Sequence, residues 1–154
     1  MHIRRAQVDE HEVLSRIARE AKAHWGYRAE DLGRWEADLT VSADSVGQQP
    51  TFVAEVACYI AGFFQLSLAA DGPELEHFWV LPAYMGKGIG RALIERAVRE
   101  IAERGHVRLL IDADPNAERF YIACGAVRTG EKPAPAAGQP QRVRPQLVLS
   151  ANAT

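Results

Sequence analysis

The spacing of apolar side chains predicts helices in four parts of the chain. Apolar residues recur every three or four positions, which places them on one face of a helix. Four segments show this pattern: residues 13–21, 29–39, 90–103 and 116–124. Asp9 precedes the first segment, and Gly105 and Gly125 follow the last two, as expected of residues that begin and end helices. The polar stretch 42–50 is expected to be a loop that closes the second helix.

Runs of β-branched and aromatic residues predict strands. Seven segments are of this kind: residues 3–6, 51–57, 59–69, 75–80, 107–112, 126–131 and 143–149. Residues 51–57 and 59–69 are expected to pair antiparallel across a turn near Cys58. The short apolar run 107–112 follows a helix, which predicts a strand buried on both faces and parallel to its predecessor. The element order predicts a mixed α/β layer fold with a largely antiparallel sheet and one parallel pair.

Composition and charge favour a single globular domain over residues 1–154. The chain is 47% hydrophobic and 25% charged, which is enough for a sizeable core. A net charge of −2 supplies no broad basic field, so we expect no nucleic-acid partner. No segment approaches the roughly 20 apolar residues that cross a bilayer, and the start of the sequence lacks a signal-like apolar run. We therefore expect a cytoplasmic protein with no membrane partner.

The two cysteines, Cys58 and Cys124, lie far apart and form no Cys-x-x-Cys pair. This spacing indicates neither a disulfide framework nor a zinc site, so we expect no metal. Both are interpreted as small buried hydrophobic residues.

A glycine-rich loop joins the strand 75–80 to the helix 90–103. The loop contains Gly86, Gly88 and Gly90, and it lacks the Gly-Lys-Ser/Thr ending of a Walker loop. It also fails the G-x-G-x-x-G spacing of a dinucleotide fingerprint. A strand, a glycine run and a helix would present consecutive N–H groups and a helix N-terminus to phosphate oxygens. We therefore expect an anion site here.

The segment Val80-Leu81-Pro82, followed by Met85-Gly86-Lys87-Gly88-Ile89-Gly90, resembles motif A of the GNAT superfamily of acetyl-CoA-dependent N-acetyltransferases. In that family the loop amides bind the pyrophosphate of coenzyme A. Met85 stands where the family has Arg or Gln, so a polar side-chain contact is lost. Lys87 and Arg91 offer positive charge or are simply solvated. The resemblance implies these cofactor-binding residues: Trp79, Val80, Met85, Gly86, Lys87, Gly88, Ile89, Gly90 and Arg91.

The segment ADPNAERFYIACGA resembles motif B of the same family. Four residues fall in register with it: Ala117, Phe120, Tyr121 and Gly125. Asp114 stands at the family's asparagine position and Ala126 at its aromatic position. The resemblance implies a cofactor contact by Phe120. Asn116 has two open roles, a cofactor contact or the N-terminal cap of the helix.

Tyr121 is the candidate general acid. When an amine attacks a thioester the sulfur leaves as a thiolate, and a phenol with a pKa near 10 can protonate it. The alternative is an aromatic core residue.

Glu76 is the candidate general base, because a protonated amine has no lone pair with which to attack. Strict alternation along the strand groups Glu76 with Glu74, Phe78 and Val80, and sets Leu75, His77 and Trp79 on the other face. A carboxylate among apolar neighbours has a raised pKa. Glu76 also resembles the strand carboxylate that several family members use as a base, and His77 is the alternative.

An acceptor site is implied near the N-terminal helices and the late loop 132–141, which form the acceptor half in this family. His24, Trp25 and Tyr27 cluster around Gly26 and could frame an acceptor pocket or pack one helix on the next. We expect the acceptor to be an amine on a small molecule or a peptide, and we keep a homodimer open.

The resemblance implies a GNAT-like three-layer fold and transfer of an acetyl group from acetyl-CoA to a primary amine. Transfer would occur by direct attack in a ternary complex, without a metal. The alternative is a coenzyme A-binding regulatory domain that has lost chemistry. Met85, Asp114 and Ala126 motivate that alternative, because all three depart from the family pattern.

Overall fold

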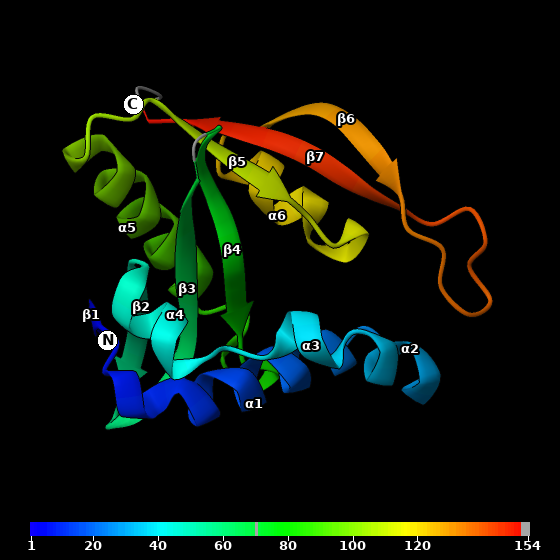
Figure 1. Ribbon diagram of the computed structural model, residues 1–154, viewed down its shortest axis with the longest axis horizontal. Helices are drawn as coiled ribbons and strands as arrows, with labels where there is room; N and C mark the ends of the chain where they lie inside the picture. The colour runs from blue at the N-terminus through cyan, green and yellow to red at the C-terminus, as the bar shows by residue number, and fades with distance from the viewer. Residues whose placement is uncertain (70, 152–154) are drawn as a thin grey trace.

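The structure is a computed structural model that describes residues 1–69 and 71–151. Its described strands form one sheet in the order β1-β2-β3-β4-β5-β7-β6 (Figure 1). They are β1 (His2–Arg5), β2 (Thr51–Val56), β3 (Tyr59–Ala69), β4 (Gly72–Val80), β5 (Arg108–Asp112), β6 (Val127–Pro133) and β7 (Val143–Ser150). All neighbours pair antiparallel except β4 and β5, which are parallel. The predicted mixed α/β fold with one parallel pair is confirmed.

The helices depart from prediction between α1 and β2. The described helices are α1 (His11–Ala23), α2 (Ala29–Arg34), α3 (Glu36–Leu39), α4 (Ala43–Gln48), α5 (Ile89–Glu103) and α6 (Glu118–Ala123). The single helix predicted over 29–39 is wrong, because the chain leaves the helical conformation at Trp35 and forms α2 and α3. The predicted loop 42–50 contains α4. Ser42 caps this helix by accepting a hydrogen bond from the Ser45 amide at 3.1 Å, and Val46 anchors it in the core.

The sheet is buried on both faces, which gives three layers. Adjacent residues of β3 point to opposite sides: Phe63 packs with α1 and α4, whereas Phe64 packs with α5. On the β2 strand, Val53 and Phe52 divide in the same way. Two-sided burial explains why β3 has an almost continuous apolar sequence.

A β-bulge at Glu76 overturns the predicted faces of β4. Gln65 pairs with His77 and Leu66 pairs with Leu75, so Glu76 is an extra residue with no partner on β3. As a result Leu75 lies in the cluster beneath α5 that Phe78 also joins, instead of sharing a face with His77. Because of the bulge, the Glu76 side chain does not follow the alternation of β4 side chains between the two faces of the sheet, and it is exposed.

The turn between β2 and β3 corrects the expectation that both cysteines are buried. Ala57 and Cys58 have φ values of 49° and 70°, in the left-handed region that two-residue hairpin turns require. Cys58 is exposed because side chains at a hairpin tip point to solvent, and Cys124 is half-buried.

The strands β4 and β5 diverge beside the glycine loop. Their only paired position is Glu74 with Leu110, within the described residues. Beyond this point the two strands spread apart in a V, which Figure 1 shows between the dark green and yellow-green arrows. The sheet is therefore open on the β5 side of β4, next to α5 and α6.

Candidate active site

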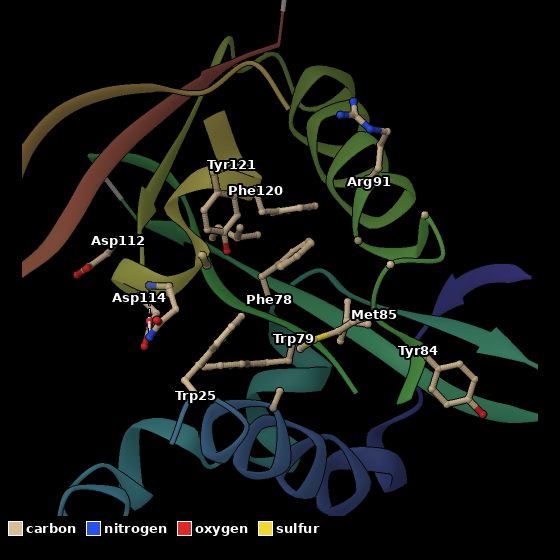
Figure 2. Close-up of a pocket in the computed structure, with 18 of the residues that line it drawn as sticks. Trp25, Phe78, Trp79, Tyr84, Met85, Arg91, Asp112, Asp114, Phe120 and Tyr121 are labelled. Atoms are coloured by element: carbon tan, nitrogen blue, oxygen red, sulfur yellow. Dashed lines mark hydrogen bonds between the residues drawn. The ribbon is translucent and has the colours of Figure 1, made fainter. Parts of the chain in front are cut away.

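A cleft of about 500 Å³ lies in this opening between β4 and β5 (Figure 2). One wall comes from β4, one end from the loop before α5, and the other wall from α6 and the turn Pro115–Ala117. Phe78, Phe120 and Tyr121 form an aromatic wall with ring centroids 5.4–5.8 Å apart. Ten of the residues singled out from the sequence line this cleft beside Glu76 and Tyr121: Trp25, Trp79, Val80, Met85, Gly86, Gly88, Gly90, Arg91, Asn116 and Phe120.

The glycines of the loop keep the backbone accessible. Gly86 and Gly88 have φ values of 76° and 83°, which L side chains rarely adopt, and open space surrounds the place of a side chain at each. Gly90 has another reason, since a Cβ there would lie 3.1 Å from the Phe120 ring. The helix α5 begins at Ile89, so its first N–H groups have no intrahelical acceptor. This end of the cleft is suited to an anion.

The charged residues near the loop lie in different places. Arg91 lines the cleft and donates a hydrogen bond from Nη2 to the Ala123 carbonyl at 3.1 Å. Lys87 lies outside the cleft lining, with its ammonium 5.6 Å from the centre of the Tyr84 ring. The Ile89 side chain is buried in the core, so only its backbone is available to a ligand.

Tyr121 is held in the protonated form. Its side chain is buried but lines the cleft, and its hydroxyl has no hydrogen-bond partner in the described parts of the chain. Burial raises the pKa of this phenol, and the Asp114 carboxylate and Cys124 raise it further. Figure 2 shows the hydroxyl pointing towards the interior of the cleft. A neutral phenol here can donate a proton to a ligand.

Glu76 stands where two clefts meet. It lines the first cleft and also a second one, described below. The pKa of Glu76 is raised by loss of solvation in the concave wall, and then by the carboxylates of Glu74, Asp38 and Asp112. A raised pKa makes an ionised carboxylate a better proton acceptor.

His77 is poorly suited to act as a base. Its Nδ1 accepts a hydrogen bond from Trp79 Nε1 at 3.1 Å, which assigns the ring proton to Nε2. Burial lowers the pKa of His77 to about 4, so the ring stays neutral. Its basic nitrogen is already occupied, and this arrangement favours Glu76.

The second cleft lies between β4 and β5, the helices α1 to α3 and the loop after β6. Four positions line both clefts besides Glu76: Leu75, Trp79, Asp112 and Asp114. The second cleft has mixed charge. Its cationic lining residues are Lys22, Arg34, Arg142 and Arg144, and its carboxylates are Asp38, Glu74, Glu76, Asp112 and Asp114.

Asp114 connects three distant segments around these clefts. Its Oδ2 accepts hydrogen bonds from Lys22 Nζ at 2.6 Å, the Tyr27 hydroxyl at 2.9 Å and Arg142 Nη2 at 3.3 Å. Burial would raise the pKa of Asp114, but the Lys22 charge and the hydrogen bonds outweigh it and lower the pKa overall. Burial lowers the pKa of Lys22 against the attraction of Asp114.

The cap before α6 is Asp114 and not Asn116. Asp114 Oδ1 accepts from the Asn116 amide at 2.8 Å and from its side chain at 2.9 Å. Of the two roles left open for Asn116, the N-terminal cap is therefore wrong, because the Asp114 carboxylate caps the turn Pro115–Ala117 that leads into α6. Asn116 lines the first cleft and also donates to the Tyr27 hydroxyl at 3.2 Å.

His24, Trp25 and Tyr27, the three candidates for an acceptor pocket, lie in different surroundings. Trp25 lines the first cleft, and His24 packs edge-on against it with ring centroids 5.0 Å apart. Tyr27 is buried and lines neither cleft. Burial and Asp114 raise the pKa of its hydroxyl to about 12. Tyr27 therefore packs the N-terminal helices on Asp114 and Arg142 instead of framing a pocket.

The loop between β6 and β7 is bound to the N-terminal helices. Asp31 Oδ2 accepts from the Ala137 amide at 2.9 Å, and Arg34 Nη2 donates to the Pro135 carbonyl at 3.3 Å. Sequence reasoning missed these contacts and the lining residues Lys22, Asp38, Asp112, Arg142 and Arg144. No local motif marks them, because their partners lie up to 115 residues away.

The described residues contain neither a metal-binding cluster nor a helix that could span a membrane. No group of histidine, cysteine, aspartate or glutamate side chains in residues 1–69 and 71–151 is arranged to hold a metal ion. Over the same residues, every helix is too short or too polar to cross a membrane.

Comparison with known proteins places these features in a family. Residues 8–138 match the acetyltransferase (GNAT) domain family. A GCN5-related N-acetyltransferase from Rhodopseudomonas palustris has a similar structure, with a TM-score of 0.79, 22% identity and coverage of 97% of this chain and 94% of that one. The PaiA N-acetyltransferase from Thermoplasma acidophilum, in complex with coenzyme A, is also similar in structure. Its TM-score is 0.75 at 19% identity, and the match covers 97% of this chain and 98% of that one. The fold is that of these enzymes, and the chain belongs to the GNAT acetyltransferase family.

Proposed function

We propose that this protein is an acetyl-CoA-dependent N-acetyltransferase that acetylates a primary amine by direct attack in a ternary complex. The observation that carries the proposal is the first cleft, which lies in the opening between β4 and β5. It has phosphate-accepting amides at one end, and both Tyr121 and Glu76 line it. Family membership independently supports acetyl transfer.

The cleft is suited in three ways to a coenzyme A thioester. Gly86, Gly88 and the start of α5 supply amides for a pyrophosphate, with Arg91 beside them. The open edge of β4 supplies backbone groups that have no strand partner. Phe78 and Phe120 supply an apolar wall. Acetyl-CoA bound there would contribute a reactive acetyl thioester.

The two proton-carrying side chains have complementary roles in this proposal. Glu76 accepts a proton from the ammonium of the acceptor, directly or through water, and frees the lone pair of nitrogen. The new N–C bond forms as the C–S bond breaks, and the Tyr121 hydroxyl donates its proton to the departing sulfur. The acylated nitrogen then releases its surplus proton to give the amide, and a proton returns to the Tyr121 phenolate through solvent. The raised pKa values of both residues match these roles, because one must accept a proton and the other must retain its own until transfer.

The first test is calorimetric titration of acetyl-CoA and coenzyme A. We expect micromolar binding by the wild type and its loss in Gly88→Glu, where a carboxylate would meet the phosphates. Gly105→Glu is the matched control: Gly105 lies at the other end of α5, has a φ of 85° and open space around it. It introduces equal backbone strain and charge away from the cleft, so binding should persist. A folded wild type that binds neither ligand would overturn the proposal.

A coenzyme A-binding regulatory domain is the second candidate. Met85 lines the phosphate end without a polar group, and Asp114 is engaged by Lys22, Tyr27 and Arg142. Binding without acetylation of any amine in a mass-spectrometric screen would favour this candidate. Acetylated product at catalytic turnover would exclude it.

A further inference from the structure

The charges in the second cleft are unevenly matched. Every cation that lines it has a carboxylate partner: Lys22 and Arg142 bind Asp114, Arg34 binds Asp31, and Arg144 lies 3.1 Å from Asp112. By contrast, the side-chain carboxylates of Asp38, Glu74 and Glu76 form no hydrogen bond or ion pair with the part of the chain that the structure describes. The cleft therefore has three carboxylates whose charge the protein does not neutralise.

These three carboxylates act on one another. All three line the same cleft. In addition to burial, the charges of Glu74 and Asp38 raise the pKa of Glu76. Asp38 comes from α3, whereas Glu74 and Glu76 come from β4. Two separate elements thus place negative charges near one another. The repulsion between these carboxylates costs free energy, and a bound cation would reduce that cost.

His77 gives independent evidence that the cleft holds a ligand. Its side chain is about 94% buried, since the residue is 6% exposed, and it lines the cleft. Nδ1 is engaged by Trp79, but Nε2 has no partner among the described residues. A buried polar group without a protein partner faces whatever fills the cavity. The neutral ring adds no positive charge that would repel a cationic ligand.

We propose that the acceptor is an amine that carries a second cationic group, such as a short aliphatic diamine. Its reacting nitrogen would lie beside Glu76 and its second cation between Glu74 and Asp38. This inference rests on the proposed acetyltransferase function and narrows its substrate class. Leu75 and Trp79, which also line the cleft, offer an apolar surface to the carbon chain between the two charges.

The spacing of the carboxylates indicates the length of the acceptor. Two residues of a regular strand span roughly 6–7 Å, and the bulge at Glu76 shortens the span between the backbones of Glu74 and Glu76. A chain of about four carbons or fewer between the two nitrogens fits this span. A monoamine would leave the second site unneutralised, and an amino acid would place its carboxylate among like charges.

The experiment compares three acceptors with the same carbon chain: putrescine, butylamine and γ-aminobutyrate. They differ only in the far end, which is an ammonium, a methyl or a carboxylate group. With acetyl-CoA at saturation, we expect kcat/KM for putrescine to exceed that for butylamine by about 4- to 25-fold, since each exposed ion pair contributes about 2- to 5-fold. γ-Aminobutyrate should be the poorest substrate. The preference for putrescine should weaken as salt is raised.

Variants locate the preference. Asp38→Asn and Glu74→Gln should each reduce the putrescine-to-butylamine ratio by about 2- to 5-fold. Glu36→Gln, on α3 but outside the cleft lining, should leave the ratio unchanged. A ratio near one in the wild type, a preference for γ-aminobutyrate, or no acetylation of putrescine by a protein that binds acetyl-CoA would each overturn this inference. Failure to bind acetyl-CoA would instead overturn the proposed function.

Discussion

Substituting Asp114 with asparagine should destabilise the protein more than other single charge removals. Asp114 accepts from Lys22, Tyr27 and Arg142 through one oxygen and caps the turn before α6 through the other. Asparagine keeps the shape but removes the charge. It would leave Lys22, with a side chain 11% exposed, and Arg142, with one 3% exposed, without a carboxylate.

The magnitude follows from the burial of these partners. Removing one member of a buried ion pair costs about 3–5 kcal/mol, because the other charge stays desolvated. The lower end applies here, since the pKa of Lys22 is already lowered and the amine can lose its proton. Unfolding entropy for 154 residues is about 0.3 kcal/mol per kelvin. A loss of about 3 kcal/mol therefore lowers Tm by about 9 °C.

Thermal unfolding at several pH values is the assay. A carboxylate whose pKa is depressed in the folded state stabilises the protein above its unfolded pKa of about 3.9, and this stabilisation is lost as pH falls through the folded value. The difference between wild type and Asp114→Asn should therefore be full at neutral pH and shrink in acid. Asp44→Asn, at an exposed position on α4 whose side chain has no hydrogen bond or ion pair within residues 1–69 and 71–151, should change Tm by less than about 2 °C.

A different outcome would refute this reasoning. If Asp114→Asn lowers Tm no more than Asp44→Asn, the charged network contributes nothing to stability. If the Tm difference is the same at acid and neutral pH, the effect comes from the cap and not from the ionised carboxylate.

Four further changes test other features. Gly62→Ala should cost about 1–3 kcal/mol in urea unfolding, since its Cβ would lie 2.6 Å from the Trp79 carbonyl oxygen; an unchanged midpoint would contradict this close approach. Cys58→Gly should stabilise by about 1 kcal/mol in the same assay, because glycine relieves the positive φ. Tyr121→Phe should slow acetyl transfer about 100-fold with unchanged coenzyme A affinity; wild-type turnover would return Tyr121 to a packing role. Glu76→Gln should remove the rise of rate with pH through the raised pKa of the carboxyl, and an unaltered profile would exclude Glu76 as the base.

Much of the fold could be predicted from the sequence because the sheet is buried on both sides. Neighbours such as Phe63 and Phe64 are both apolar, so the strands stand out from the amphipathic helices. The bulge at Glu76 could not be predicted, since an extra residue in one strand is defined only by its partner strand. The break at Trp35 could not be predicted either, because the glycine near it, Gly33, lies inside α2 and no proline stands beside it.

The first cleft was more predictable than the second. Its phosphate end is a continuous segment with glycines at fixed spacing. The backbone conformation of such a segment depends mainly on its own residues, so it can be predicted from them. The second cleft joins residues from α1, α3, β4, β5 and β7. The partners of Asp114 are separated from it by 92, 87 and 28 positions, so only the folded chain brings them together.

The divergence of β4 and β5 divides the sheet into two ribbons, one of β1 to β4 and one of β5, β7 and β6. Within the described residues, only Glu74 and Leu110 join them. A molecule lying along the gap and bonding to the free edge of β4 would act as an additional strand between the ribbons. Binding of such a ligand would stabilise the paired form of the β4 edge against local opening. Amides along this edge should therefore exchange their hydrogens more slowly when the cleft is filled.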